Sequence, residues 1–341
     1  MSGPADVLLD ARVTRRMSVG MAAYARELAA RLPRIAPDLR FDVYRDGSNF
    51  GPDEQVMLPL YALRSKARFV HHLSVYAPLL TPAPFAITIH DLIHLRFPDQ
   101  FKRSVGPYYR TVVRAVCARA RIVFTDDPRT VADLERFLHV DPRKIRVVPL
   151  GVDDAFTGPL AAPAAARPYF FYAGNHRAHK NLRVLIEAWL ALPEDREADL
   201  VLTGEADLGS LGGARRRLGT LRFAGDVTTA DLALLYRGAA AYVHPALCEG
   251  FGLPMLEAAA VGTPVIASEE CVPAVLRAIA ARFPAADAGA LGGLLLAALD
   301  GPPAEAERER LRTVARFYSW DRVAASTAEV YREVLEECPS R

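Results

Sequence analysis

Two glutamates stand eight residues apart around a glycine-rich turn, in the segment Glu249-Gly-Phe-Gly-Leu-Pro-Met-Leu-Glu257. The two glycines let the main chain approach a ligand closely, and the proline suits the first turn of a helix. Because free N–H groups and the helix dipole attract anions at such a helix start, we expect a phosphate or diphosphate there. Each carboxylate can accept hydrogen bonds from vicinal hydroxyls, which ribose and hexose carry. The alternative interpretation is a glycine-proline loop with two solvated glutamates.

A second group of candidate residues, Gly174-Asn-His-Arg177-Ala-His-Lys180-Asn181, directly follows an expected strand at residues 169–172. Arg177 and Lys180 could neutralise a leaving diphosphate, and Asn181 would start a helix. Basic residues at a strand-to-helix turn are more often solvated surface. The anion-binding turn downstream in the same half supports the functional interpretation.

The N-terminal half offers two weaker candidates. The segment Ser18-Val-Gly20-Met-Ala-Ala-Tyr24 follows the first expected strand, and its glycine could bring the main chain to an anion. Ordinary turn chemistry explains that glycine equally well. The segment Thr88-Ile-His90-Asp91-Leu-Ile-His94 ends another strand, where His90 could bind a substrate hydroxyl or steady an anomeric centre. A structural histidine is the alternative.

The elements that would position these residues form two similar series. Short β-type runs alternate with helical patterns, which is typical of parallel sheets covered by helices. The first series has expected strands at 7–9, 86–89, 121–124 and 145–148, with helices at 21–32, 105–120 and 130–138. The second has strands at 169–172, 199–202, 221–223, 241–243 and 264–266, with helices at 181–190, 229–237 and 255–260. Residues 151–168, rich in Ala, Pro and Gly, read as a linker. A ligand would bind at the carboxyl ends of the strands, between the domains.

Composition fits an ordinary globular chain of two domains, with 341 residues of which 51% are hydrophobic and 24% charged. A net charge of +2 argues against a dedicated nucleic-acid binder. The total hides an asymmetry, because residues 1–150 hold 23 Lys and Arg against 15 Asp and Glu. The rest of the chain holds 19 basic and 25 acidic residues.

Cysteine usage and apolar patterning indicate a cytoplasmic protein without a disulfide framework or a structural zinc site. The four cysteines lie far apart, and neither a Cys-x-x-Cys pair nor zinc-finger spacing occurs. Asp6 and Asp10 fall inside the first apolar stretch, which is the reverse of a secretory signal. The longest stretch without Lys, Arg, Asp or Glu, residues 69–90, contains several prolines and histidines and reads as loop and strand.

Residues 101–121 combine Lys102, Arg103, Arg110, Arg114 and Arg119 with interleaved Tyr and Val. At helical spacing they give a cationic face and an apolar face, which predicts a peripheral contact with a membrane. The alternative is a core helix with a solvated arginine face.

Together these segments resemble glycosyltransferase family 4. The segment from Glu249 to Glu257 resembles the Glu-(seven residues)-Glu region of that family, and residues 172–182 resemble its diphosphate-binding loop. Val147-Val-Pro-Leu-Gly151-Val-Asp153 resembles the strand that ends its N-terminal domain. Further matches, in the expected order, are Gly20 with Tyr24, Ile89-His90-Asp91-Leu92 and Tyr318-Ser-Trp320.

The resemblance implies a GT-B fold of class α/β, with two Rossmann-like domains whose parallel sheets face a central cleft. The N-terminal, acceptor-binding domain would span residues 1–152 and the C-terminal, nucleotide-sugar-binding domain residues 165–318. A final helix at about 319–341, which Ser319 can cap, would return to the N-terminal domain.

For the donor, the resemblance implies that Glu249 holds sugar hydroxyls and Glu257 the ribose hydroxyls. Further donor contacts would come from Gly174, Phe251, Gly252 and Leu253.

The resemblance also assigns the leaving group and the acceptor side. Arg177 and Lys180 would stabilise the departing nucleoside diphosphate, with Gly20 approaching it from the opposite domain. His90 would lie beside the anomeric carbon, and Asp91 and Tyr24 complete this side.

The reaction implied is transfer of a hexose, with retention and without a metal or other cofactor, from GDP-mannose or a UDP-sugar to a glycan or lipid-linked acceptor in polysaccharide, lipopolysaccharide or glycoconjugate synthesis. The sequence contains no Asp-x-Asp motif. One departure from the family pattern is Ala274, where a glutamate is usual. The alternatives are a nucleotide-sugar 2-epimerase and a non-catalytic sugar-nucleotide-binding subunit. A Rossmann dehydrogenase is disfavoured, because no Gly-x-Gly-x-x-Gly follows the first strand of either half.

Overall fold

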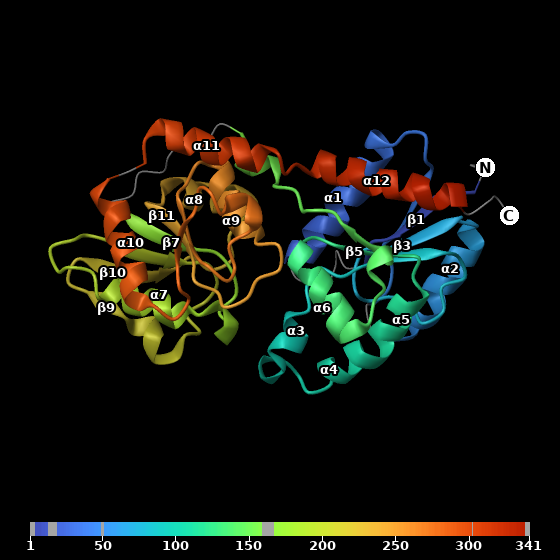
Figure 1. Cartoon of the computed structure of the whole chain (residues 1–341), viewed down its shortest axis with the longest axis horizontal. Helices are drawn as coiled ribbons and strands as arrows, with labels where there is room; N and C mark the ends of the chain where they lie inside the picture. The colour runs from blue at the N-terminus through green and yellow to red at the C-terminus, as the bar shows by residue number, and fades with distance from the viewer. Residues whose placement is uncertain (1–3, 13–18, 49–50, 159–166, 302, 338–341) are drawn as a thin grey trace. The chain divides into compact units, whose positions relative to one another are not determined.

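The computed structural model describes residues 4–12, 19–48, 51–158, 167–301 and 303–337 (Figure 1). The chain forms two compact units, one of residues 1–151 with 320–341 and one of residues 152–319. Part of the expected linker (159–166), Ser18, Cys338 and the end of the expected last helix lie outside the described residues. Each unit is described below by itself.

The first unit is built on a six-stranded parallel sheet. Its strand order is β2 (Phe41–Tyr44), β1 (Val7–Asp10), β3 (Phe69–His72), β4 (Phe85–Thr88), β5 (Ile122–Thr125) and β6 (Ile145–Val147). Every residue of the four central strands is buried. Strands covered on both faces read as continuous apolar runs, which is why β4 and β5 stand out in the sequence.

Helices surround this sheet (Figure 1). They are α1 (Val19–Ile35), α2 (Leu58–Ser65), α3 (Ile93–Arg96), α4 (Val105–Tyr108), α5 (Arg114–Arg119), α6 (Pro128–Leu138) and α12 (Trp320–Glu337). The expected helix at 105–120 is interrupted by a π-helical turn at Tyr109–Val113, and another π-helical turn, Asp53–Met57, leads into α2.

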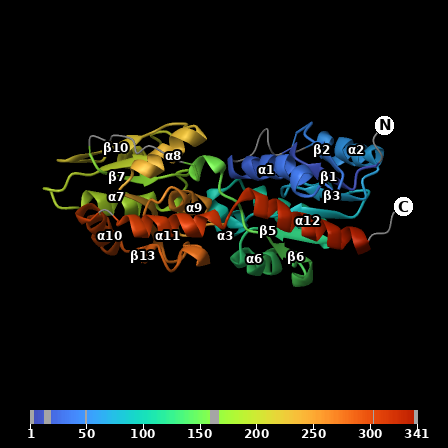
Figure 2. The same cartoon turned by 90° about the horizontal axis from the view of Figure 1, so that it is seen from above.

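The last described helix, α12, joins the first unit, as the resemblance implies. It lies along α1 in Figure 2, and Asp321 accepts hydrogen bonds from Arg31 and Arg34, both at 2.6 Å. Farther along the helix, the Tyr331 hydroxyl lies 2.6 Å from Nδ1 of His71 on β3. This contact places Tyr331 in the core of the sheet, where it is fully buried.

The second unit has a seven-stranded sheet with the order β13 (Ala281–Phe283), β12 (Val265–Ser268), β11 (Ala241–His244), β7 (Tyr169–Tyr172), β8 (Asp199–Leu202), β10 (Gly219–Phe223) and β9 (Arg215–Arg216). All neighbouring strands are parallel except β9 and β10. Its helices are α7 (Leu182–Leu190), α8 (Thr229–Gly238), α9 (Leu253–Ala260), α10 (Ala288–Asp300) and α11 (Glu305–Arg316).

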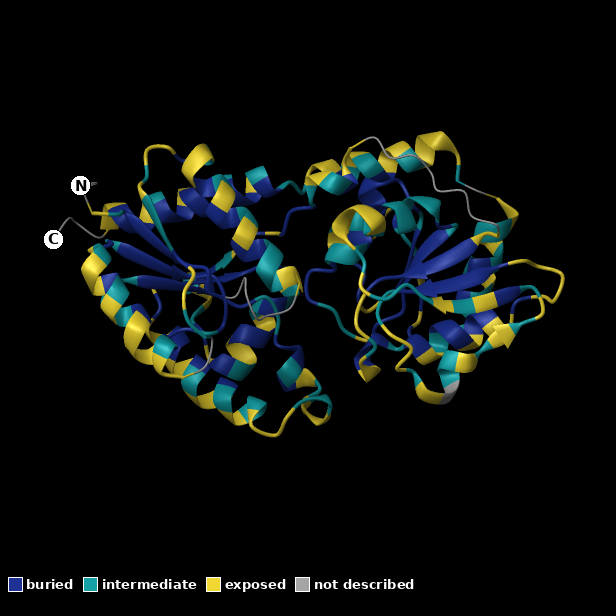
Figure 3. Cartoon of the chain, turned by 180° about the vertical axis from the view of Figure 1, so that it is seen from behind, coloured by how far each residue is buried: buried dark blue, intermediate teal, exposed yellow. Residues whose placement is uncertain are grey.

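The core of each unit lies between its sheet and helices, and Figure 3 shows the central strands of both sheets as buried and the helices as partly exposed. Packing against the second sheet is tight at Gly219, the first residue of β10. A Cβ atom there would overlap the main-chain oxygen of Ala198. Only glycine fits this position without displacing β8. Each unit is therefore an α/β sandwich, and within each sheet the parallel strands end at one edge.

Candidate functional site

The residues that follow β7 and β11 meet, because these two parallel strands are neighbours in the second sheet. Nζ of Lys180 donates to Oε2 of Glu249 at 2.6 Å, and Nε2 of His244 lies 2.9 Å from the same oxygen. Burial alone would raise the pKa of Glu249, but Lys180 and His244 outweigh it and hold that pKa below its usual range. The site therefore keeps an ionised carboxylate beside an ammonium group.

Asn181 joins three loops at this edge. The residue starts α7, as expected, but in a left-handed conformation with φ of 55°, and its side chain caps no helix N–H. Instead, Nδ2 donates to the main-chain oxygens of Pro245 at 3.0 Å and Ala285 at 2.7 Å. The asparagine thus fixes the loop that carries Lys180 against the loop that leads to Glu249.

The turn between the two glutamates has the geometry expected of an anion site at a helix start. Gly252 has a φ of +83° and directly precedes α9, whose first turn contains Pro254. A Cβ atom at Gly252 would lie 2.5 Å from Met255 and 3.0 Å from Pro273. Phe251 is buried, with its ring centroid 5.9 Å from that of Tyr318. Leu253 is half-buried at the helix start.

Glu257 lies one turn into α9 and has a different environment. The Tyr236 hydroxyl donates to its Oε2 at 3.0 Å. Desolvation raises the pKa of Glu257 to about 7, because it exceeds the opposing effect of the Tyr236 hydrogen bond, and Asp153 adds to the rise. The environments of the two glutamates of the motif therefore shift their pKa values in opposite directions, down for Glu249 and up for Glu257.

Gly174 and Arg177 lie on the loop after β7 and Ala274 lies after β12, and all three are more exposed than Lys180. Gly174 is exposed with φ of +150°, and its N–H donates to the Thr203 hydroxyl at 3.0 Å. The Arg177 side chain is exposed, one residue before a short 3-10 turn at Ala178–Lys180. Ala274 is exposed and begins another 3-10 turn, Ala274–Leu276.

In the first unit, His90 follows β4 and faces a carboxylate that the sequence analysis did not single out. Its Nδ1 lies 2.6 Å from Oδ2 of Asp126, which follows the neighbouring strand β5. Burial would lower the pKa of His90, but Asp126 and then Asp91 outweigh it, so that pKa is raised. Nε2 is buried and has no hydrogen-bond partner among the described residues. A protonated His90 could therefore donate from Nε2 to a substrate oxygen.

The other predicted residues of this unit divide into two groups. Tyr24 lies beside His90, with ring centroids 4.8 Å apart, and its hydroxyl contacts Thr88 at 3.2 Å. The Asp91 carboxylate instead accepts from the N–H of Ile93, the first residue of α3, at 3.0 Å. Gly20 is exposed in α1, and a Cβ atom there would meet no described atom within 4 Å.

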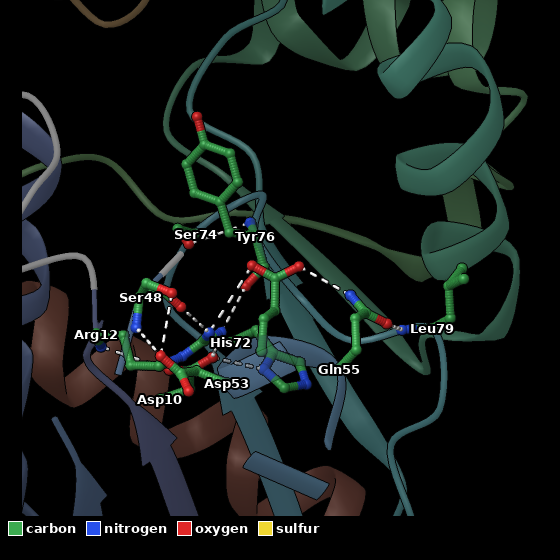
Figure 4. Close-up of polar contacts among 10 residues, drawn as sticks. Asp10, Arg12, Ser48, Asp53, Gln55, His72, Ser74, Tyr76 and Leu79 are labelled. Carbon is green, nitrogen blue, oxygen red and sulfur yellow. Dashed lines mark hydrogen bonds and ion pairs between the residues drawn. The ribbon is translucent and has the colours of Figure 1, made fainter. Parts of the chain in front are cut away.

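A buried polar cluster at the ends of β1 and β3 was also missed (Figure 4). Arg12 holds both oxygens of Asp10, at 2.7 and 2.8 Å, and donates to the main-chain oxygens of Ser48 and Tyr76, each at 3.0 Å. Asp10 ends β1, whereas Ser48 and Tyr76 follow β2 and β3, so one guanidinium group joins the end of β1 to two loops at the carboxyl edge of the sheet.

Two further groups complete this cluster. His72 lies opposite Asp10 in the β1–β3 register, with Nδ1 2.9 Å from Oδ2 of Asp10. Burial would raise the pKa of Asp10, but Arg12 and His72 lower it to about 2. Glu54 shows the opposite effect: its Oε2 lies 3.8 Å from Arg12, and burial raises its pKa to about 7.

The described residues contain no cluster of three or more His, Cys, Asp or Glu arranged to hold a metal ion. Among the described helices, none has the length and apolar character needed to cross a membrane.

Two family models match successive parts of the chain. Residues 61–156 match the model described as "Glycosyltransferase Family 4", and residues 167–300 match "Glycosyl transferases group 1". Together the matched ranges include the His90 segment, the Lys180 loop and the motif from Glu249 to Glu257.

Curated relatives agree with these models. O-antigen chain mannosyltransferase B of Escherichia coli is 26% identical over 293 residues, covering 80% of this chain and 76% of the relative. D-inositol 3-phosphate glycosyltransferase of Xylanimonas cellulosilytica is 34% identical over 247 residues, covering 61% of this chain and 56% of the relative. The chain thus spans little more than half the length of the second relative.

Among solved structures, HepE of Anabaena in complex with UDP-glucose is similar with a TM-score of 0.71 and 14% identity, over 96% of this chain and 99% of that one. This likeness shows that the two Rossmann-like units form a GT-B fold. Both models describe glycosyltransferases and they match in order, so the chain is similar to glycosyltransferases over residues 61–156 and 167–300.

Proposed function

We propose that the protein is a retaining glycosyltransferase that moves a hexose from a nucleotide-diphosphate sugar, GDP-mannose or a UDP-sugar, to a glycan or lipid-linked acceptor. The observation that carries this proposal is the Lys180–Glu249 pair, 2.6 Å between charged atoms, beside the helix start at Gly252. One arrangement offers a cation and free N–H groups to a diphosphate and an ionised carboxylate to sugar hydroxyls. Mannosyltransferases among the relatives and UDP-glucose bound to HepE support the donor class.

The proposed donor contacts follow from the environments of the two glutamates. Glu249 stays ionised and accepts hydrogen bonds from hydroxyls of the transferred sugar. Glu257, with its pKa raised to about 7, binds the ribose hydroxyls. Gly174 and the main chain at Phe251–Leu253 contact the sugar and the diphosphate of the donor.

The chemical step is then an electrostatic one. The acceptor hydroxyl attacks the anomeric carbon on the same face from which the diphosphate leaves, as the bond to the diphosphate oxygen breaks, and a phosphate oxygen takes the hydroxyl proton, so the configuration is retained. Lys180 and Arg177 stabilise the charge that develops on the leaving diphosphate, so no metal is needed in this scheme. His90, held by Asp126, donates from Nε2 to a substrate oxygen near the anomeric carbon.

Thermal-shift measurements with GDP- and UDP-sugars test the donor, because a ligand that binds only the folded state raises the unfolding temperature. Incubation of the shifting donor with and without acceptors then distinguishes the functions. Transfer with retained anomeric configuration supports the proposal. Epimerised donor without acceptor would identify a 2-epimerase, and binding without any turnover would identify a non-catalytic subunit.

Variants test whether transfer depends on the proposed donor site. Lys180→Met and Glu249→Gln should each lower turnover by about 100-fold or more, the usual effect of removing one group that stabilises developing charge. Arg183→Met is the matched control, because this arginine is exposed on α7 and pairs with Glu187 at 2.7 Å outside the site. Equal activity of the control and the Lys180 variant would contradict the assignment.

A further inference from the structure

Strand β11 ends in a buried histidine that lies beside Glu249. His244 is the last residue of β11 and is 1% exposed. Its Nδ1 lies 2.9 Å from the hydroxyl of Tyr242, which is fully buried two residues earlier in the same strand. Residues two apart in a strand point to the same face, so the strand itself brings these two side chains together. His244 thus joins the core of the second unit to the edge that carries the candidate site.

The contact between His244 and Glu249 is close but incomplete. Nε2 of His244 lies 2.9 Å from Oε2 of Glu249. The ring N–H is not directed at that oxygen, however, because Nε2 has no hydrogen-bond partner among the described residues. Leaving a buried donor unpaired is unfavourable, so such an atom indicates a partner that it gains in another state of the site.

The proton on His244 is fixed by the groups around it. An ionised carboxylate only accepts, so the contact with Glu249 favours a proton on Nε2. A second proton on Nδ1 would place another cation beside Lys180, whose Nζ lies 2.6 Å from the same carboxylate oxygen. Nδ1 therefore accepts the hydroxyl proton of Tyr242 at 2.9 Å, which is a shorter contact than the 3.4 Å from this hydroxyl to the main-chain oxygen of Ala173.

Lys180 contacts Glu249 in the structure and the diphosphate in the proposed reaction. Its Nζ donates to Glu249 at 2.6 Å and meets no other acceptor among the described residues. An ammonium group has three N–H donors and could reach both anions, but its single charge is largely compensated by Glu249. For the diphosphate to gain the full charge, Glu249 needs another partner, because a carboxylate that is only 15% exposed is unstable without one.

We propose that His244 is a positioning residue, which takes over Oε2 of Glu249 when Lys180 turns to the diphosphate of the donor. Only a small rotation of the carboxyl group is needed, since the two atoms are already 2.9 Å apart. Glu249 then keeps its place and its charge, with Oε1 left for a sugar hydroxyl. The Tyr242 hydroxyl supports this exchange by keeping the His244 proton on Nε2. The inference rests on the proposed function, because it requires a diphosphate at Lys180.

Calorimetric titration of GDP and UDP into the whole chain tests the exchange, because either nucleotide brings a diphosphate without a hexose. His244→Asn keeps an oxygen that can accept from Tyr242 and removes the donor near Glu249. It should bind the nucleotide that wild type binds about tenfold more weakly, since Lys180 then stays with Glu249. His244→Gln places an N–H close to the position of Nε2 and should bind nearly as well as wild type.

A double-mutant cycle separates the exchange from a merely structural role of His244. In a Glu249→Gln background no carboxylate holds Lys180, so adding His244→Asn should change nucleotide affinity by less than about twofold. A residue that only supports the fold would lower the affinity by the same factor in both backgrounds. Equal factors would therefore overturn the proposal.

The position of the His244 proton has a readout of its own. Long-range proton–nitrogen NMR spectra of the chain with isotope-labelled histidine distinguish a ring nitrogen that carries a proton from one that does not. The chain has 8 histidines, and the signals that disappear in His244→Gln are those of His244. We expect a proton on Nε2 and none on Nδ1, with and without nucleotide. A proton on Nδ1 alone would exclude the exchange.

Failure of the exchange and failure of the proposed function give different results. If wild type binds neither GDP nor UDP, the proposed function is contradicted, and the exchange with it. If wild type binds one of them and His244→Asn binds it equally well, the exchange is wrong and the proposed function stands. A loss of about tenfold that disappears in the Glu249→Gln background, with the proton on Nε2, supports the role of His244.

Discussion

Replacing Lys180 by methionine removes the ammonium group that faces Glu249 and keeps most of the aliphatic stem. The two side chains are only 10% and 15% exposed. At an effective dielectric constant of about 20, unit charges 2.6 Å apart attract by about 6 kcal/mol, and desolvation of both groups offsets most of this. Removing one partner of a buried pair costs about 3–5 kcal/mol. We expect about 3 kcal/mol, the low end of that range, because His244 still faces the carboxylate.

The pH dependence follows from the direction of each pKa shift. In wild type the pKa of Glu249 lies below its ordinary value of 4.5, so its stabilising contribution is complete above that value and is lost as the pH falls toward the folded-state pKa. In Lys180→Met, burial raises the pKa of Glu249, and the carboxyl group takes up a proton as the pH falls. The deficit of the variant should therefore shrink by about 1 kcal/mol between about pH 7.5 and pH 5.

Urea unfolding followed by circular dichroism measures both effects. The double variant Lys180→Met/Glu249→Gln should recover part of the lost stability and show no such pH dependence, because it buries no charge at this position. A free energy of unfolding for Lys180→Met within about 0.5 kcal/mol of wild type near pH 7.5 would refute the reasoning. An equal deficit at both pH values would refute the assigned pKa shift.

Three further predictions concern single positions. The pKa of Glu257 is raised to about 7, so protonation of this group stabilises the folded state at low pH, and that stabilisation is lost as the pH rises through 7. The unfolding temperature of Glu257→Gln should therefore rise relative to that of wild type between about pH 5 and pH 8. Parallel pH profiles of the two unfolding temperatures in calorimetry would contradict this. Gly219→Ala should destabilise by about 1–3 kcal/mol through a main-chain clash, whereas Gly293→Ala, in open space on α10, should be neutral or stabilising in the same urea titration. Arg12→Met should cost about 3–5 kcal/mol and Arg12→Lys should not rescue it, because lysine lacks the two-pronged contact; a lysine variant as stable as wild type would exclude this explanation.

The elements that are best predicted from the sequence are those whose own residues form a recognisable pattern, without help from distant parts of the chain. Strands such as β4, β5 and β7 are continuous apolar runs, and the motif from Glu249 to Glu257 contains its own glycines and its helix start. Strand β3 reads poorly, because it ends in His71 and His72. Both histidines can be buried because their ring nitrogens contact polar groups of residues distant in the chain, among them Tyr331.

The same limit applies to the candidate site. Residue types at the end of a strand identify Lys180, His90 and Glu249 as candidates, but not the partner of each. Asp126 lies 36 residues beyond His90, and the Lys180–Glu249 contact spans 69 residues. Such pairs depend on which strands become neighbours, and that order is a property of the whole sheet. Helix α10 was missed for a local reason, since three glycines weaken its helical pattern.

The position of α12 in the first unit has a consequence for biosynthesis. The ribosome releases residues 152–319, a continuous stretch with its own core, before it releases α12. Until then the nascent first unit lacks Tyr331, which covers His71 and Phe124 on its sheet. The half of the protein that is made first is therefore completed last, and a nascent chain halted before Trp320 would present an unfinished apolar face to chaperones.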